Sequence, residues 1–191
     1  MAVGKKTNAV VDKGGNELIN ILLTNRAIPT TLTANTNIFN LGHIASTTVE
    51  QQNSTTDFKS EDGEIQATED DFTRQTTASL MQTDADLINY LGSTVKNTEI
   101  LEIKYLGLRG GSDVWHFRIG NVTPQYNVTS PGGTTSMQYI HKGIGLSSDF
   151  TIATATMASI ATALGLNTSS YFPTVAVTIP ASENFEVAEV S

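Results

Sequence analysis

The stretch EILEIKYLGLRGGSDVWHFRIG, residues 99–120, carries the clearest secondary-structure pattern of the chain. Apolar and polar side chains alternate on both sides of Gly110-Gly111, which is typical of two strands joined by a tight turn. The stretch therefore predicts a β-hairpin, with Glu102 and Lys104 on one face of its first strand. The other face is expected in the core, where the chain's only tryptophan would pack against the facing strand. The predicted core residues of this hairpin are Leu101, Ile103, Tyr105, Trp115, Phe117 and Ile119.

Residues 64–81 alternate in the same way, after a turn predicted at Asp62-Gly63. Phe72, Ala78 and Leu80 share the face that we expect to be buried. The opposite face is made of small neutral hydroxyls and amides, which is typical of a smooth solvated wall and also of an ordinary outer sheet face. That face carries Thr73, Gln75, Thr77 and Ser79.

A helical period replaces the alternation after Thr83. Thr83 can cap a helix whose first turn carries Asp84 and Asp86, because carboxylates are favourable near the positive end of a helix. Gly92 is expected to end or fray this helix near Ser93. Its predicted buried stripe is Leu87, Ile88, Tyr90 and Leu91.

The remaining segments predict more strands and one further helix. Residues 125–129, 136–144 and 171–179 alternate as strands, whereas residues 153–165 have helical spacing and end at Gly165. Residues 17–24 fit a short helix and a buried strand equally well. Together these segments predict a mainly β fold, a β-sandwich or barrel-like sheet with one or two short flanking helices.

Composition agrees with a β fold. The apolar fraction is 39% and the charged fraction 16%, and both are low for a globular protein. Thr, Asn, Ser and Gly are correspondingly frequent, and these residues favour strands and turns. The chain has no cysteine, which excludes disulfides and thiolate sites and is typical of a protein that is made or assembled in a reducing cytosol. No apolar run approaches the roughly 20 residues of a membrane span, and we expect no membrane segment.

Domain organisation follows from where apolar residues are scarce. Residues 17–180 are expected to form a single β-rich domain. Residues 1–16 are polar and carry Lys5 and Lys6, so we expect an arm that partners order. Residues 29–60 predict a long loop or hairpin that reaches a neighbouring subunit. Residues 181–191 are acidic and have no core of their own, and they are expected to be a free tail or a strand added to a neighbour.

The sequence contains no clear catalytic, metal-binding or nucleotide-binding motif. His43, His116 and His141 show no zinc-binding spacing, and His116 is expected to face solvent or another subunit. Glu69, Asp70 and Asp71 lack the pattern of a calcium loop. No nucleophile elbow, dinucleotide loop or Walker loop is present. We therefore expect no catalytic, cofactor-binding or metal-binding residues. The net charge of −8 argues against ordinary nucleic-acid binding.

The order of elements resembles a known family. An alternating strand over residues 64–81, a helix opened by Thr83-Asp84-Ala85-Asp86, and the hairpin of residues 101–108 and 115–122 are similar to the core of major tail-tube proteins of long-tailed bacteriophages. The resemblance covers residues 60–150. It implies a β-sandwich or barrel, flanked by a helix, that forms hexameric rings, which stack into the conduit for the phage genome.

The resemblance also implies partners and a location. The subunit would pair with copies of itself and with tape-measure and terminator proteins, and it would reside in the virion tail after assembly in the host cytoplasm. DNA would pass without specific binding, and Thr73, Gln75, Thr77 and Ser79 would face the lumen. Two alternatives remain open: another virion protein, such as a decoration, head-completion or terminator protein, and a carbohydrate-binding β-sandwich that uses Tyr126, Tyr139 or Tyr171.

Overall fold

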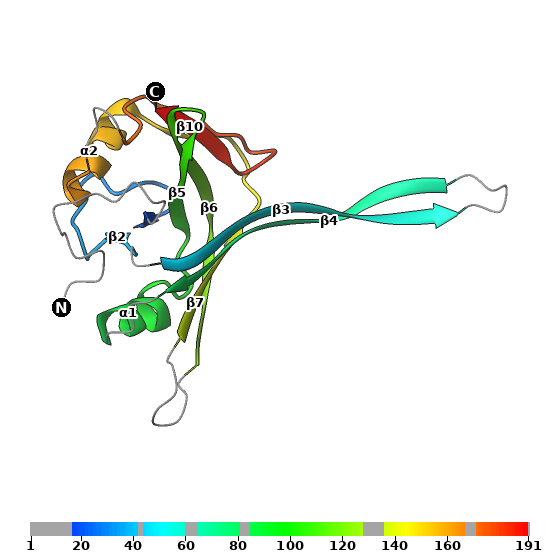
Figure 1. Cartoon of the computed structure of the whole chain (residues 1–191), viewed down its shortest axis with the longest axis horizontal. Coiled ribbons are helices and arrows are strands. Elements are labelled where there is room, and N and C mark those ends of the chain that lie inside the picture. The colour runs from blue at the N-terminus through cyan, green and yellow to red at the C-terminus, as the bar shows by residue number, and fades with distance from the viewer. Residues whose placement is uncertain are drawn as a thin grey trace.

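The computed structural model describes residues 17–41, 44–59, 65–80, 85–127, 136–166 and 171–190. The fold is mainly β, as predicted, and consists of a large antiparallel sheet with two short helical segments (Figure 1). The sheet runs in the order β2-β1-β5-β6-β7-β4-β3, and β10 also pairs with β6. Its strands are β1 (Leu18–Leu22), β2 (Ile38–Asn40), β3 (Ile44–Lys59), β4 (Ile65–Leu80), β5 (Ile100–Arg109), β6 (Ser112–Asn127), β7 (Ser136–Gly143) and β10 (Glu186–Val190).

The hairpin predicted from residues 99–120 is confirmed as β5 and β6 at the centre of the sheet. Tyr105 and Trp115 face each other across the pair, with ring centroids 5.0 Å apart. Residues 17–24 form a strand, β1, and not a helix. Leu18, Ile19 and Ile21 are all fully buried. A strand buried on both faces loses its apolar alternation, which is why its sequence was ambiguous.

One hydrophobic core lies between the sheet and a cover made by α2 (Thr154–Leu164) and the strand pair β8 (Phe150–Ile152) and β9 (Val177–Ile179). Trp115 sits in it, and its indole N–H donates to the carbonyl of Tyr171 at 2.7 Å. α2 ends at Gly165, as predicted, with φ of 66°. The six side chains predicted for the hairpin core are all buried here.

A second core lies on the opposite face of the sheet, under α1 (Ala85–Asn89) and the π-helical turn η1 (Tyr90–Thr94). Leu87, Tyr90 and Leu91 are buried there, whereas Ile88, expected in the same stripe, is 36% exposed. The helical segment ends at Thr94, one residue beyond the end predicted near Ser93, and its last turn is a π turn. Thr83, predicted to cap it, lies outside the described residues.

A long two-stranded arm, β3 with β4, is the dominant feature outside the cores. Each strand has 16 residues, and Figure 1 shows the pair leaving the body as a twisted ribbon. β7 pairs with β4 only through residues 75–80, so the described pairing to the body stops there. Residues 29–60, predicted to form a long loop or hairpin, contain β2 in the body and β3 in the arm, and the second strand of the arm is β4, which was predicted as a separate strand. The predicted turn at Asp62-Gly63 lies outside the described residues.

The C-terminal segment is neither a free tail nor a strand for a neighbour. β10 pairs antiparallel with β6 of the same chain, from Glu186↔Phe117 to Val190↔Asp113. Ala188 and Val190 pack against the first core. The core of the domain therefore buries the apolar side chains of a segment that is too short to form a core of its own. Residues 1–16, expected to be an arm, lie outside the described residues, as does His43.

Candidate functional site

The face of β5 and β6 that lies opposite Trp115 and Phe117 carries charged side chains, and these side chains are buried. Glu102 and Arg118 are fully buried, and Lys104 and His116 are 2% and 3% exposed. The expectation that His116 faces solvent or another subunit is wrong. The sheet curls until β4 covers this face, so that Thr76 of β4 reaches Glu102 of β5 although β6 and β7 lie between them in strand order.

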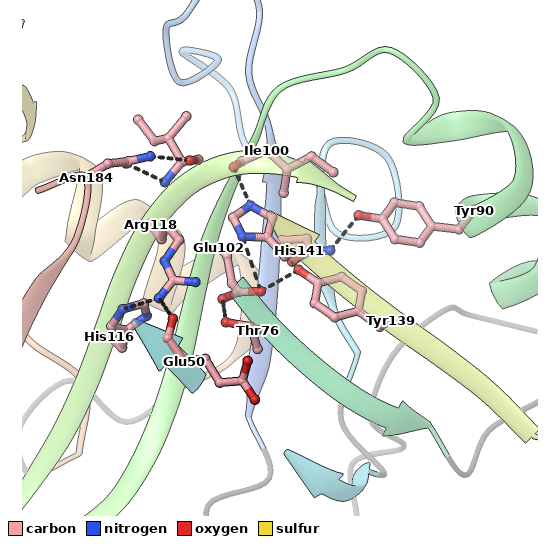
Figure 2. Close-up of polar contacts among 12 residues, drawn as sticks. Glu50, Thr76, Tyr90, Ile100, Glu102, His116, Arg118, Tyr139, His141 and Asn184 are labelled. Carbon is pink, nitrogen blue, oxygen red and sulfur yellow. Dashed lines mark hydrogen bonds and ion pairs between the residues drawn. The ribbon is translucent and has the colours of Figure 1, made fainter. Parts of the chain in front are cut away.

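Glu102 is the centre of this polar cluster (Figure 2). Its Oε1 accepts the hydroxyl of Thr76 at 2.5 Å, and its Oε2 accepts that of Tyr139 at 2.6 Å. Burial by itself would raise the pKa of Glu102, but the positive charge of His141 when it is protonated and these two hydroxyls outweigh it and hold the pKa below its ordinary value. Glu102 is therefore a carboxylate at neutral pH.

His141 lies beside Glu102, with Nδ1 3.6 Å from Oε2. Its Nε2 donates to the carbonyl of Ile100 at 3.1 Å. Burial lowers the pKa of His141, and the carboxylate of Glu102 offsets this only in part. The cluster continues from Tyr139 to the side-chain oxygen of Asn20, 2.9 Å away, and the amide of Asn20 donates to the Tyr90 hydroxyl at 3.1 Å. The chain of contacts thus joins β7, β1 and η1.

Arg118 and His116 form the other half of the cluster. Nη2 of Arg118 lies 3.3 Å from Nε2 of His116 and donates to the carbonyl of Glu50 at 3.4 Å. Among the described residues, Nε and Nη1 of Arg118 have no hydrogen-bond partner. Burial and the nearby Arg118 lower the pKa of His116 to about 4, so His116 is neutral and accepts from the guanidinium.

These contacts converge on the root of the β3–β4 arm. Thr76 binds Glu102, and the backbone of Glu50 binds Arg118. Gln75 donates to the side chain of Glu50 at 3.2 Å, and Arg74 donates to the carbonyl of Ser182 at 2.8 Å. Both strands of the arm are therefore fixed to the body by directional bonds where the ribbon leaves it.

The predicted polar face of β4 is present at the arm root. Gln75, Thr77 and Ser79 are half-buried, whereas Thr76, Ala78 and Leu80 between them are buried. Thr73, the fourth residue proposed for a lumen, has its side chain outside the described set. The sequence interpretation missed the buried cluster. One signal could have indicated it, because the hairpin register pairs Glu102 directly with Arg118 and Lys104 with His116.

In the described part of the chain, no group of three or more His, Asp or Glu side chains is placed to hold a metal ion. No helix in that part has the length and hydropathy that a membrane crossing requires. Comparison with protein-family models finds no match, and comparison with curated proteins finds none.

Proposed function

We propose that this chain is the repeating structural subunit of a self-assembling tube of the phage tail-tube type, and that it is not an enzyme. The observation that carries the proposal is the β3–β4 arm. An isolated two-stranded ribbon is marginally stable in water, and this one extends well beyond its pairing to the body (Figure 1). Another chain that packs on the arm would stabilise it.

Copies of the same chain are the simplest such partner. Among the described strands, β3 pairs only with β4, so its outer edge is open along 16 residues. Open edges promote uncontrolled association unless a defined partner pairs with them. An arm that docks on a different surface of an identical subunit makes a head-to-tail contact, which closes into a ring when the rotation permits. Rings of this kind that stack would give a tube.

The tube assignment itself rests on the resemblance of residues 60–150 to tail-tube proteins. It implies hexameric rings, a virion location, and contacts with tape-measure and terminator proteins. The half-buried hydroxyls and amides of Gln75, Thr77 and Ser79, with Thr73, are the residues that we propose for the lumen. A wall of neutral side chains on a subunit of net charge −8 would let DNA pass without binding.

The absence of an enzymatic role is inferred from the burial of the polar cluster. Glu102, His116 and His141 are the groups best suited to acid–base chemistry, and each is at most 3% exposed. A general acid or base must lie within hydrogen-bond reach of its substrate. The contacts of the cluster go to the arm root and neighbouring strands. We therefore assign it the role of holding the arm in one orientation.

The two alternative functions are a carbohydrate-binding protein and another virion protein, and the structure argues against the first. A carbohydrate-binding surface would need exposed aromatic rings, but Tyr139 is fully buried and Tyr171 is 2% exposed. Tyr126 has its side chain outside the described set. A decoration, head-completion or terminator protein would use the same arm in a smaller closed assembly, and only the shape of the assembly separates it from a tube.

The test is the size and shape of the purified full-length protein. Sedimentation velocity and negative-stain electron microscopy over a concentration series should show rings or tubes. A variant with residues 52–73 replaced by Asn-Gly should remain a folded monomer, since Gln51 and Arg74 are a paired position that a two-residue turn can close. Monomeric wild-type protein at high concentration, or assembly of the shortened variant, would overturn the proposal. Short caps or trimers would favour the terminator or decoration alternative.

A further inference from the structure

Strand β6 continues beyond the end of its partner β5. The β5 ladder ends at Ile100↔Gly120, whereas β6 runs to Asn127. Over residues 121–127, β6 pairs with β7 on its other side. On the β5 side, this part of β6 has no strand partner in the described chain. Such an edge can accept an added strand through backbone hydrogen bonds.

A groove runs along this open edge. It has a volume of about 660 Å³, and Asn121, Val122 and Thr123 of β6 form one wall. The opposite wall comes from the helical segment and the turn after it, with Leu91, Gly92, Val95, Lys96, Asn97 and Glu99. A second groove of about 560 Å³ adjoins it, shares Asn97 and Glu99, and is otherwise lined by residues 22–26 and Thr98.

The size of the grooves suits an extended segment. An added strand occupies roughly 4.8 Å by 10 Å in cross-section and 3.3 Å per residue, or about 160 Å³ per residue. The first groove therefore holds about four residues and the second about three more. Leu91, Val95 and Val122 give the first groove an apolar floor, which is what alternate side chains of an incoming strand require.

The charges of the groove lining and of the arm indicate which extended segment would bind there. The residues that line the two grooves include two cations, Arg26 and Lys96, and one carboxylate, Glu99. Arg26 forms an ion pair with Glu99 at 3.1 Å, so the net charge of the lining is +1 and lies at Lys96. Residues 57–71, which include the outer part of the arm, contain seven carboxylates and one lysine, so they hold −6 of the net charge of −8. An acidic ribbon and a cationic groove on one molecule are complementary between two copies.

We infer that this groove is the acceptor for the β3–β4 arm of a second copy, which adds an edge strand of its ribbon to residues 121–127 of β6. The inference rests on the proposed self-assembly and names the surface that receives the arm. Each copy then has one donor and one acceptor at different places, which gives a head-to-tail interface. The arm gains a third strand and the β6 edge gains a partner. One contact therefore pairs both open strand edges.

Gly92 offers a direct way to fill the groove. It lines the groove, and a Cβ built on it meets nothing within 4 Å. Gly92→Trp should therefore occupy the site without disturbing the body and weaken self-association by at least about tenfold. Gly92→Ala is the matched control, because it adds only a methyl group at the same position, and it should assemble like wild type. Circular dichroism and thermal unfolding check that both variants keep the fold.

A mixing experiment separates donor from acceptor. The variant with residues 52–73 replaced by Asn-Gly retains the groove and lacks the arm, whereas Gly92→Trp retains the arm and lacks the groove. Each alone should be monomeric, and a mixture should give a one-to-one heterodimer and nothing larger in sedimentation velocity. Lys96→Glu should reduce heterodimer formation when introduced into the arm-less partner, and added salt should do the same.

The outcomes distinguish this inference from the proposed function. Rings or tubes formed by Gly92→Trp alone would show that the arm docks elsewhere, and self-assembly would stand while the acceptor would be overturned. A monomeric wild type would overturn both. Assembly lost equally in Gly92→Trp and Gly92→Ala would assign the effect to the helical turn and not to occupancy of the groove, and would also overturn the acceptor.

Discussion

The hydroxyl of Thr76 donates to the buried carboxylate of Glu102 across 2.5 Å. The two residues stand on β4 and β5, with β6 and β7 between them in the sheet. The bond therefore exists only because the sheet is curled, and it ties the root of the arm to the central hairpin. Since the arm carries the proposed assembly function, the orientation of the arm depends on this buried contact.

Thr76→Val should destabilise the fold by about 2 kcal/mol, because a hydrogen bond to a charged group is lost and a carboxylate oxygen is left buried with fewer donors. Urea denaturation measures the change. Thr77→Val is the matched control, since Thr77 is the next residue of the same strand but lies on the half-buried opposite face. Equal effects for the two substitutions would contradict a special role for the Thr76 hydroxyl.

Asn184→Ala should loosen the C-terminal strand. The Asn184 side chain accepts from the Ile119 amide at 3.1 Å and donates to the Ile119 carbonyl at 2.7 Å, and so fills the gap on β6 between the β10 and β7 ladders. We expect a loss of about 2 to 3 kcal/mol, because the buried amide of Ile119 loses its acceptor and the Ile119 carbonyl keeps only the amide of Ile144 as a donor. Hydrogen exchange in Glu186–Val190 should accelerate.

Ser182→Ala is the control for that experiment, because Ser182 is exposed and contributes its carbonyl, not its hydroxyl, to the contact with Arg74. Exchange in β10 should be unchanged in this variant. Unaltered protection of β10 in Asn184→Ala would show that strand pairing alone holds the C-terminal segment.

Stability should fall as the pH drops from about 6.5, the ordinary pKa of histidine, toward 4. Burial and Arg118 lower the pKa of His116 to about 4, so in this window the unfolded chain binds more protons at His116 than the folded one, and stability rises with pH. The full contribution is about 3 kcal/mol. Below the ordinary pKa of Glu102, protonation of that carboxyl removes a further contribution, because its folded pKa is also lowered.

Chemical denaturation at several pH values measures this dependence. His116→Gln should flatten the profile between pH 4 and 6.5, where His141 contributes the remaining slope because its pKa is lowered in the same direction. An identical profile for wild type and His116→Gln would mean that His116 is not buried as a neutral side chain.

Gly120→Ala should prevent stable folding, with a cost of about 3 kcal/mol or more. A Cβ at this position would overlap the backbone carbonyl of Lys142 on β7, at the point where the β5 and β7 ladders meet on β6. Gly92→Ala, which meets no atom within 4 Å, is the control. Thermal unfolding should separate the two variants clearly, and comparable melting temperatures would contradict the close packing at Gly120.

Local sequence patterns were sufficient to predict an element and its buried side where one face of the element is apolar and the other polar. The alternation around Trp115 predicted the β5–β6 hairpin and its core, and helical spacing predicted α2 with its end at Gly165. Periodicity was insufficient where both faces are buried. β1 was ambiguous for that reason, and His116 was expected to face solvent or another subunit although it is 3% exposed and the ring of Phe185 stacks on it. The pattern also misjudged Ile88, which is 36% exposed because it lies beside the stripe that Leu87, Tyr90 and Leu91 form at i, i+3 and i+4.

The sequence by itself determined most of the strands and helices, because side-chain period and turn residues are properties of neighbours in the chain. It left β1 undecided, and of the strand predicted over residues 171–179 only Val177–Ile179 forms, as β9. It also determined the long polar excursion that became the β3–β4 arm, and the concentration of negative charge in residues 57–71. Only the tertiary structure decided that the charges of β5 and β6 are buried and that the C-terminal strand returns to β6. These outcomes depend on the curl of the sheet, which brings together residues that are up to about 120 positions apart and so leave no local pattern.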